Sequence, residues 1–476
     1  MLTTKDEVLI KSQFVQVVRD GDRAVIWHSL FGNPRIVSEE TIALLNVFSR
    51  PCPLGSVLNE YDFGEDGEEA IQDLIASHYL IPKDFDEREF LARRMQKRES
   101  TITNGSLIDN LELIMSEACN FRCTYCVHFN SLETSDRINN PKKFMTLETA
   151  KETVDNFLKI MGRQGKRVAR GKARKVAEIN FGGGEPLLVW PVIAQVLEYC
   201  RANYSHEFVF EFSINTNASL ITPEIARKLK EYNVKIASSL DGLKEGNDKV
   251  RLTKIGGGTF ESILRGFETL KKEEYPIDGI AVTVNEQNFP SLDEKIIDWA
   301  AQRQMRDVRI DIDIINMVEI PVEDIVAKLM RIQRYAHRYN IEAFGFWSRP
   351  VENLNESSLT ARVAFCGAVR GNSMCISPSG NIYPCGYSTT QIGTLARIDS
   401  FHGGDGQYHR FVRDRLTGMI EMCRGCMIEG QCGGGCNITQ EFAYTMKTTK
   451  IERMCDFYRQ MTRELLLDQL RESCSK

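Results

Sequence analysis

Apolar and polar residues repeat with two different periods along the middle of the chain. Six short runs rich in branched and aromatic residues predict buried strands, and the segments between them repeat apolar residues at helical spacing. The expected strands are 111–115, 177–181, 208–214, 235–239, 277–283 and 308–315. Thr146 and Thr222 stand at expected helix starts, and Ser291 with Glu294 matches a capping box. These strand–helix units predict an α/β fold, a parallel sheet or partial (β/α)6 barrel over residues 107–320.

The first 95 residues have a different pattern. Strands expected at 14–19 and 23–28 flank Asp20-Gly21-Asp22, which is typical of a hairpin, and a third strand is expected at 34–37. Helical patterns follow at 39–48, 68–78 and 84–99, and the polar run 100–106 predicts a linker. Residues 1–95 are therefore expected to form a separate module that resembles a winged-helix fold.

The last third of the chain is rich in glycine and cysteine. A helix expected at 322–340 opens a bridging region, 321–365, and a last helix is expected at 454–470. Residues 366–476 otherwise show little periodicity, so their apolar core is thin. A region of this kind is expected to need metal to hold it together.

Composition narrows the class of protein. The chain has 476 residues, 42% apolar and 26% charged, which is typical of globular proteins. A net charge of −5 gives no general attraction to nucleic acid or anionic membranes, and no apolar run reaches the length of a membrane span. The polar start MLTTKDEVLIKSQ does not read as a signal peptide. We expect a cytoplasmic protein, in which patterned cysteines are metal ligands rather than disulfides.

Ten of the fourteen cysteines fall into two ordered sets. The first set is Cys119-x3-Cys123-x2-Cys126, directly after the first expected strand of the barrel. Three thiolates on one loop can hold three irons of a 4Fe–4S cluster and leave the fourth iron open to a small molecule. Chemistry in such folds sits at the carboxyl ends of the strands, where this loop lies.

The first set resembles the cluster loop of radical S-adenosylmethionine (SAM) enzymes. The resemblance implies that Cys119, Cys123 and Cys126 hold a cluster whose open iron binds the amino and carboxylate groups of SAM. One electron from the reduced cluster would cleave SAM to a 5′-deoxyadenosyl radical, which takes a hydrogen atom from substrate. The protein would bind, orient and shield the reactants.

Further stretches match the same family. The sequence GGEP follows the second expected strand, although a glycine run taken alone is typical of a simple turn. FSINTN and SSLDG end later strands, and NDKVR lies beyond them. By resemblance, the SAM contacts would be Tyr125, Gly183, Gly184, Glu185, Pro186, Ser213, Asn215, Asn217, Ser239, Asp241 and Arg251.

The second set resembles the seven-cysteine SPASM extension of radical SAM enzymes that act on peptides and proteins. By this resemblance one auxiliary 4Fe–4S cluster would be held by Cys423, Cys426, Cys432 and Cys455, and another by Cys366, Cys385 and Cys436. The fourth ligand of the latter is either Cys375 or a substrate thiolate at an open site. The alternative is zinc, because four-cysteine sites with C-x2-C spacing are common.

The first module resembles the element that binds the leader of ribosomally made precursor peptides, with the likeness carried by VIWHSLFGNPRIVSEETIALLNVF. Such a module would bind an extended leader as an added strand. The alternative is a structural cap without a ligand. Expected partners are a cysteine-containing precursor peptide and a low-potential electron donor such as flavodoxin or ferredoxin, with no nucleic acid or membrane.

These features together predict a peptide maturase that forms thioether cross-links from cysteine sulfur, with the electron leaving through an auxiliary cluster. The alternatives are carbon–carbon cross-linking, sulfatase maturation to formylglycine, and a metal-stabilised scaffold that only binds peptide. Sulfatase maturases carry an aspartate directly after the cysteine of the G-x4-C element, where this chain has Gly386.

Two further features are less specific. Asp311 and Asp313 share a face by period two, so they are candidates for orienting substrate or accepting a proton, with salt bridges as the alternative. The basic run 162–176 would attract an acidic peptide or form a solvated loop.

Overall fold

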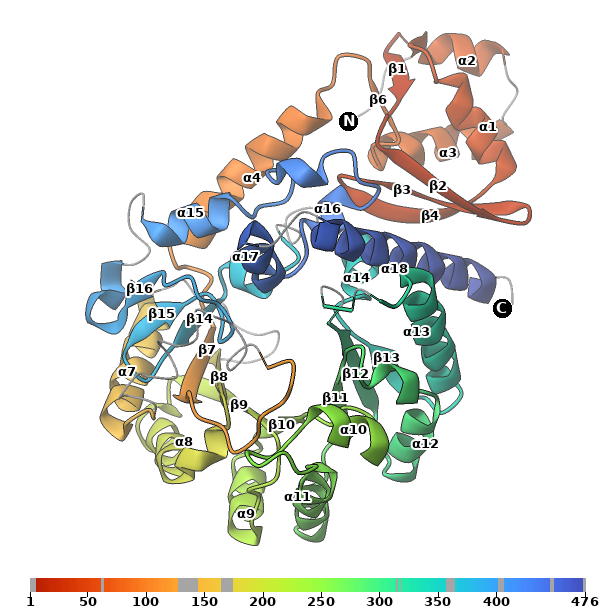
Figure 1. The fold of residues 1–476 in the computed structure, drawn as a ribbon. Helices are drawn as coiled ribbons and strands as arrows, with labels where there is room; N and C mark the ends of the chain where they lie inside the picture. Colours follow the sequence, from red (N-terminus) through yellow and green to blue (C-terminus); the bar gives the residue numbers. More distant parts are fainter. Residues whose placement is uncertain are drawn as a thin grey trace.

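The computed structural model describes residues 6–60, 64–126, 144–163, 174–313, 316–317, 319–356, 364–400, 406–445 and 449–473. Strands and helices of the middle and C-terminal regions form a ring, and the N-terminal module lies beside it (Figure 1). Most of the basic run 162–176 falls outside the described residues.

The ring is built on six parallel strands, and all six were expected from the sequence. β7 (Asn110–Ser116), β8 (Lys175–Gly183), β9 (Phe208–Thr216) and β10 (Lys235–Ser238) pair in that order. β11 (Gly279–Val284) and β12 (Asp307–Ile312) pair with each other. A parallel bridge between Ser239 and Ala281 joins the two groups. The α/β fold class with a partial barrel is therefore confirmed.

Helices cover the outside of these strands. They are α7 (Leu147–Arg163), α8 (Trp190–Tyr204), α9 (Pro223–Glu231), α11 (Phe260–Lys272) and α12 (Lys295–Gln302), whereas the short α10 (Lys244–Val250) lies on the inner side of α11 (Figure 1). Thr146 and Thr222 cap α7 and α9, since their hydroxyls accept hydrogen bonds from Thr149 N (3.1 Å) and Ile225 N (3.3 Å). Alternate strand residues such as Leu111 and Phe181 are fully buried on this helix-covered side. The residues between them face the interior of the ring.

The C-terminal region continues the barrel sheet, which the sequence did not predict. β14 (Ser373–Ile376) pairs in parallel with β7, and β15 (Asn381–Tyr383) and β16 (Gly393–Thr394) follow in the same sheet. β13 (Glu342–Phe344) extends the pair β11–β12. The helices of this part are α13 (Val322–His337), α14 (Arg349–Asn355), α15 (Gln407–Arg413), α16 (Glu429–Cys432), α17 (Asn437–Thr445) and α18 (Thr449–Ser473).

The N-terminal module contains the expected three-stranded antiparallel sheet of β2 (Val15–Asp20), β3 (Arg23–His28) and β4 (Gly32–Ser38). A second small sheet was not expected: β5 (Cys52–Pro53), β1 (Val8–Lys11) and β6 (Leu80–Pro82). The helices are α1 (Glu39–Val47), α2 (Leu54–Glu60), α3 (Gly64–Ala76) and α4 (Glu87–Thr103).

The expectation of a linker at 100–106 is wrong over its first half, because α4 continues to Thr103.

Strand β3 divides its side chains between two cores. Ala24 and Ile26 belong to a core within the module, whereas Val25 and Trp27 join the large core of the rest of the chain. Among the described residues, no helix is both long and apolar enough to cross a membrane.

Candidate functional site

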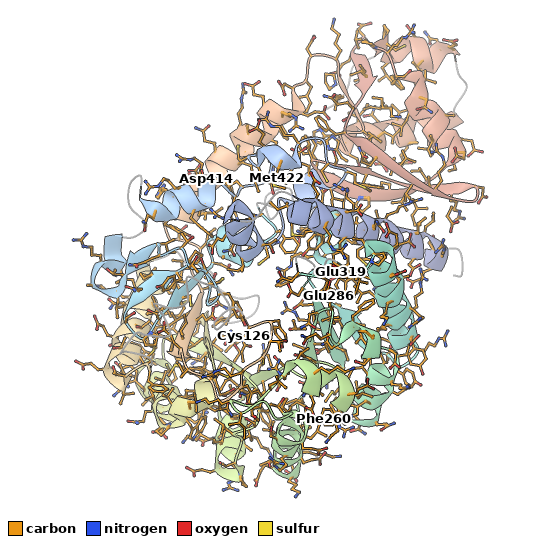
Figure 2. All side chains as sticks on the ribbon, viewed as in Figure 1. Cys126, Phe260, Glu286, Glu319, Asp414 and Met422 are labelled. Carbon is orange, nitrogen blue, oxygen red and sulfur yellow. The ribbon has the colours of Figure 1, made fainter. Side chains whose placement is uncertain are left out.

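The first cysteine set lies on the loop after β7. The loop is held against the end of α10 and the segment after it, since Thr124 N donates to Val250 O (2.9 Å) and Arg122 N donates to Leu252 O (2.6 Å). The three thiols lie within electrostatic range of one another. Figure 2 shows Cys126 on the inner side of the ring. The structure thus brings Cys119, Cys123 and Cys126 together, as the spacing predicts for one iron–sulfur cluster.

Burial controls the protonation of these thiols. It raises the pKa of Cys123 to about 11, while the nearby Arg251 guanidinium opposes the shift, and it also raises the pKa of Cys119. Buried thiols of this kind keep their protons until a metal binds and replaces them. The donor set therefore fits a cluster that is loaded with release of protons.

The GGEP loop packs tightly against the same cysteine loop. Gly183 has a φ of +112°, and a Cβ atom there would overlap the carbonyl oxygen of Ser116. A Cβ atom on Gly184 would overlap the carbonyl oxygen of Ala118. Only glycine allows this approach, so the two glycines set the position of Glu185 and Pro186 relative to the cysteines.

Glu185 fixes the end of this loop. Its side chain is fully buried and accepts hydrogen bonds from Leu187 N (3.0 Å), the Thr216 hydroxyl (2.7 Å) and Asn217 N (2.8 Å). Burial raises the pKa of Glu185, and these donated hydrogen bonds oppose the shift. The carboxylate therefore joins the loop after β8 to the end of β9, where the resemblance expects SAM.

Asn217 continues this connection to the cysteine loop. Its Nδ2 donates to Asn120 Oδ1 (2.8 Å), and Asn120 Nδ2 donates to the Ser219 hydroxyl (2.9 Å). Ser213 and Asn215 lie on the face of β9 that points into the ring, and Ser239 lies at the bridge beside β10. The strand ends named from the sequence thus converge on one region.

Tyr125, Asp241 and Arg251 form a buried network beside the cysteines. The Tyr125 hydroxyl donates to Asp241, and Arg251 Nη1 donates to the Tyr125 oxygen (2.7 Å) and to Asp241 Oδ2 (3.3 Å). Asp241 Oδ1 also accepts from Thr283 N (2.8 Å). Burial raises the pKa of Tyr125, so its phenol stays neutral at physiological pH.

Several buried polar atoms at these strand ends lack a hydrogen-bond partner. Among them are the Oγ of Ser238 beside Ser239, the Nε of Arg251, a donor, and the Oδ1 of Asn180, an acceptor two residues before Gly182 on β8. Buried polar atoms are normally satisfied, so these atoms favour a ligand that offers both donors and acceptors. SAM, with its carboxylate, amino and hydroxyl groups, is a ligand of that type.

The second cysteine set divides into two groups. Cys423, Cys426, Cys432 and Cys455 lie within electrostatic range of one another. Burial raises the pKa of Cys423 to about 12, and burial also raises the pKa of Cys455. This is the four-thiol group that the SPASM resemblance predicts.

The other group contains Cys366, Cys385 and Cys436. Cys366 and Cys436 share a hydrogen bond, and Cys385 lies within electrostatic range of both. Burial raises the pKa of Cys385 to about 12. Cys375 is buried on β14, and its thiol is hydrogen-bonded to the Glu112 carboxylate.

These groups are not arranged like a compact single-ion site. Among the described residues, no three His, Cys, Asp or Glu side chains converge as one metal ion requires. A cubane of iron and sulfur atoms is larger than one ion and needs ligands that stand further apart. Whether these groups hold clusters or zinc stays a prediction from the sequence.

Two interior residues were not identified from the sequence. Glu112 on β7 accepts a hydrogen bond from Gly386 N (2.9 Å), and a Cβ atom on Gly182 would lie 2.8 Å from its Oε1. Tyr387 lies within electrostatic range of Glu112, Cys126, Cys385 and Arg309. Glu112, Cys126 and Cys385 belong to the side of the ring built from β7, β14 and β15, and Arg309 lies on β12, so the half-exposed Tyr387 borders the space inside the ring.

The aspartates named from the sequence have different surroundings. Asp311 pairs with Arg309 (2.7 Å) and accepts from Phe346 N (3.0 Å), so the salt-bridge alternative describes it. Asp313 follows β12 and borders a cavity of about 90 Å³ that Cys436 also lines. Asp313 therefore lies between the barrel and the group formed by Cys366, Cys385 and Cys436.

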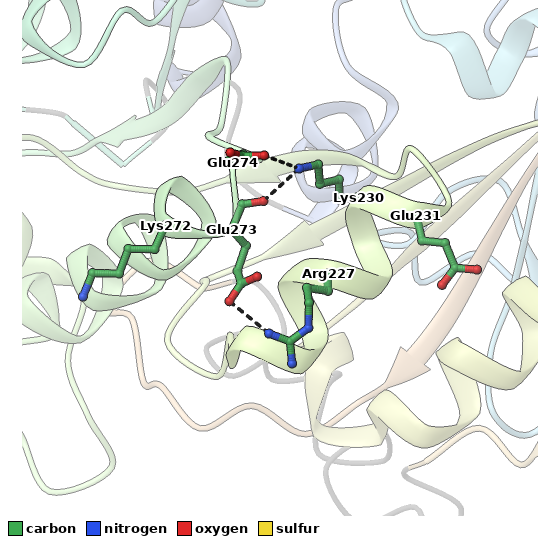
Figure 3. Close-up of a pocket in the computed structure, with 6 residues that line it drawn as sticks. All are labelled: Arg227, Lys230, Glu231, Lys272, Glu273 and Glu274. Carbon is green, nitrogen blue, oxygen red and sulfur yellow. Dashed lines mark hydrogen bonds and ion pairs between the residues drawn. The ribbon is translucent and has the colours of Figure 1, made fainter.

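A larger hollow of about 400 Å³ lies elsewhere on the surface (Figure 3). It is formed at the C-terminal ends of α9 and α11, which precede the strands and so lie at the opposite end of the barrel from the cysteine loop. Several of its charges form ion pairs with one another, as in Arg227–Glu273 (3.1 Å) and Lys230–Glu274 (3.0 Å). This hollow is therefore separate from the cysteine loop and from the expected SAM site.

The fold and site define an α/β barrel enzyme with a three-cysteine loop after its first strand. Residues 113–294 match the Radical SAM superfamily. The chain is 24% identical to the radical SAM cyclopropyl synthase TigE of Paramaledivibacter caminithermalis, over 98% of this chain and 97% of that protein. Residues 113–294 therefore form a radical SAM domain, and the chain is an enzyme.

Solved structures agree at the level of the fold. Native anSMEcpe with bound AdoMet has a TM-score of 0.60 and 18% identity, covering 77% of this chain and 99% of that chain. Streptococcus suis SuiB bound to precursor peptide SuiA has a TM-score of 0.50 and 14% identity, covering 93% and 98%. The similarity to SuiB thus spans nearly all of both chains.

Proposed function

We propose that this chain is a peptide maturase that joins side-chain atoms of a ribosomally made precursor. The observation that carries the proposal is the pairing of β7, which leads into the first cysteine loop, with β14, together with the hydrogen bond from Gly386 N, beside Cys385, to Glu112 on β7 (2.9 Å). A peptide residue inside the ring beside Tyr387 would therefore face both a SAM-binding site and an auxiliary cysteine group.

The chain's own residues have distinct parts in this proposal. Cys119, Cys123 and Cys126 would hold the SAM-binding cluster, which with SAM supplies a 5′-deoxyadenosyl radical that takes a hydrogen atom from the substrate. Arg251 and Tyr125 would bind the polar part of SAM, since Arg251 Nε is a buried donor without a partner. Glu185 holds the loop that borders this site.

The N-terminal module would receive the leader. β4 is an edge strand of its sheet, and Ile36 on that strand is 45% exposed. An edge strand with free backbone groups can pair with an extended peptide. The proposal includes four parts of the chain with the limits 1–95, 107–320, 321–365 and 366–476. Helix α4 crosses the first of these limits.

Thioether formation is the first candidate reaction. Each link would join a cysteine sulfur to a carbon, with loss of two hydrogens: one taken as an atom and one released as a proton, while one electron leaves. The group Cys366, Cys385 and Cys436 supports this candidate, because three cysteines leave a position that a substrate thiolate can take. Asp313, which shares a cavity with Cys436, would orient the substrate.

Carbon–carbon bond formation is the second candidate, favoured by one specific observation. The relative TigE, which matches over 98% of this chain, is named a cyclopropyl synthase, and a cyclopropyl ring is closed by a carbon–carbon bond. Sulfatase maturation ranks third, since Gly386 occupies the position of the expected aspartate. The nearby carboxylate comes instead from Glu112.

Mass spectrometry of a co-expressed peptide tests these reactions. A small cysteine-bearing peptide encoded beside the gene is co-expressed with the enzyme and alkylated. Loss of two hydrogens per link with a matching loss of reactive thiols supports the thioether; the same mass loss with all thiols reactive supports the carbon–carbon bond. A chain with Cys119, Cys123 and Cys126 replaced by alanine is the control. Modification by that control chain would contradict the proposal.

A further inference from the structure

The segment between Cys426 and Cys432 contacts the N-terminal module at several residues. Trp27 Nε1 donates to Met427 O (2.7 Å), and Gly430 N donates to Ser29 O (2.7 Å). The side-chain amide of Gln431 faces the Ser29 carbonyl and Gly32 N, both at 3.1 Å. Two of the four thiols of one auxiliary group are thus joined by a segment that the module holds.

A buried charge strengthens this contact. Glu429 is 1% exposed, and both of its carboxylate oxygens pair with Arg88 of α4, at 2.9 and 3.1 Å. The same carboxylate accepts from Gly425 N (2.9 Å), one residue before Cys426. A buried carboxylate needs its partners, so removal of Arg88 leaves an uncompensated charge inside the ligand segment.

The fit between the two parts is close. A Cβ atom on Gly430 would overlap the carbonyl oxygen of Leu30, so the backbones touch without side chains between them. Trp27 is 1% exposed, and its neighbours on β3 divide between the module's own core and the large core. The module is therefore packed into the rest of the chain at this segment rather than tethered beside it.

We propose that the N-terminal module is a structural part of the auxiliary site formed by Cys423, Cys426, Cys432 and Cys455. Trp27 and Arg88 are positioning residues that hold the ligand segment in the geometry that the cluster needs. This inference rests on the proposed function in one respect, namely that these cysteines hold an iron–sulfur cluster.

The test uses the full chain with Cys119, Cys123 and Cys126 replaced by alanine, so that only auxiliary clusters contribute. Arg88→Met and Trp27→Phe are added to this background. The matched control is Arg471→Met, which removes another ion pair between the module and the C-terminal region, Arg471–Asp20 (2.7 Å), away from the ligand segment. Iron, sulfide and the electron paramagnetic resonance spectrum of the reduced protein are measured.

We expect Arg88→Met to lose up to about four irons per chain, the content of one cluster. Trp27→Phe keeps the aromatic packing and removes one hydrogen bond, so it is expected to fold and to shift the resonance of one auxiliary cluster. Arg471→Met should match its parent. Spectra and iron contents of Arg88→Met and Trp27→Phe equal to those of Arg471→Met would overturn the inference, even if their thermal stability falls.

A folded parent chain without any iron–sulfur cluster would be a different result. It would show that these cysteines do not hold a cluster, and the proposed cofactor content would fail together with the inference. A parent with clusters and unaffected variants removes the inference alone.

Discussion

Replacing Glu185 with glutamine would test how the SAM site is built. The carboxylate is surrounded by three donors: Oε1 receives Leu187 N and the Thr216 hydroxyl, and Oε2 receives Asn217 N. Glutamine keeps the shape but offers one oxygen and one NH2 group. Whichever way the amide is turned, a donor faces a donor and at least one hydrogen bond is lost.

The cost follows from these contacts. A hydrogen bond to a charged group contributes about 1.5–3 kcal/mol, and a buried donor left without a partner costs about 1–3 kcal/mol. We expect Glu185→Gln to lower the free energy of unfolding by about 2–4 kcal/mol. Since Asn217 also contacts the cysteine loop, we expect reductant-dependent SAM cleavage to fall by about 10- to 100-fold.

Anaerobic denaturant titration and release of 5′-deoxyadenosine measure the two effects. Glu268→Gln, at an exposed glutamate of α11, is the matched control. If Glu185→Gln is as stable as the control to within about 0.5 kcal/mol, the carboxylate is not the connection described above. Full SAM cleavage by Glu185→Gln would refute its link to the cofactor site.

Three further predictions concern other parts of the chain. Arg251→Lys should weaken SAM binding by about tenfold or more, because lysine has one nitrogen and cannot keep the contacts of Nη1 to Tyr125 and Asp241 while also offering the second donor, Nε; calorimetry with SAM checks this, and unchanged affinity would contradict it. Burial lowers the pKa of His28, so the unfolded chain binds more protons, and stability should fall as pH drops below about 6.5, a slope that His28→Gln should reduce in denaturant titrations, with the remainder from His78, whose pKa burial also lowers. Removal of iron by a chelator should make residues 364–445 sensitive to protease while the barrel keeps its helical circular dichroism, and equal protection with and without iron would count against metal support.

The barrel could be predicted from the sequence because its signals are local. Each strand carries its own apolar run, and Thr146 and Thr222 cap helices through hydrogen bonds that span only three residues. The three cysteines of the first set also lie close together, because their spacing along one loop is local, whereas the grouping of the widely spaced cysteines of the second set came from the family resemblance. Their roles in binding metal remain predictions.

Local signals gave wrong predictions where a polar side chain formed a hydrogen bond with a different backbone group from the one expected. Ser100 and Thr103 indicated a linker, but their hydroxyls donate to the Lys97 carbonyl (2.9 Å) and the Glu99 carbonyl (2.8 Å) within α4. The Ser291 capping box is wrong for a similar reason. Its hydroxyl donates to Asn288 O (2.9 Å), and α12 begins only at Lys295.

Long-range features could not be predicted in this way. The contact of Trp27 with Met427 joins distant parts of the sequence, and no periodic pattern of residues predicts it. Glu112 did leave a signal, because it is the one charged residue in the apolar run LELIM, on the face that points into the ring. Tyr387 had none beyond its place after Cys385-Gly386.

Strand β7 is not the edge of the barrel sheet, since it pairs with β8 on one side and β14 on the other. Its sequence, NLELIMS, has no lysine or proline to discourage a new partner. During synthesis β7 leaves the ribosome long before β14, so for that time its free side is open to pairing with other nascent chains. Chains cut short before residue 366 should therefore aggregate through this strand. The C-terminal region thus protects the edge of the barrel sheet from pairing with other chains.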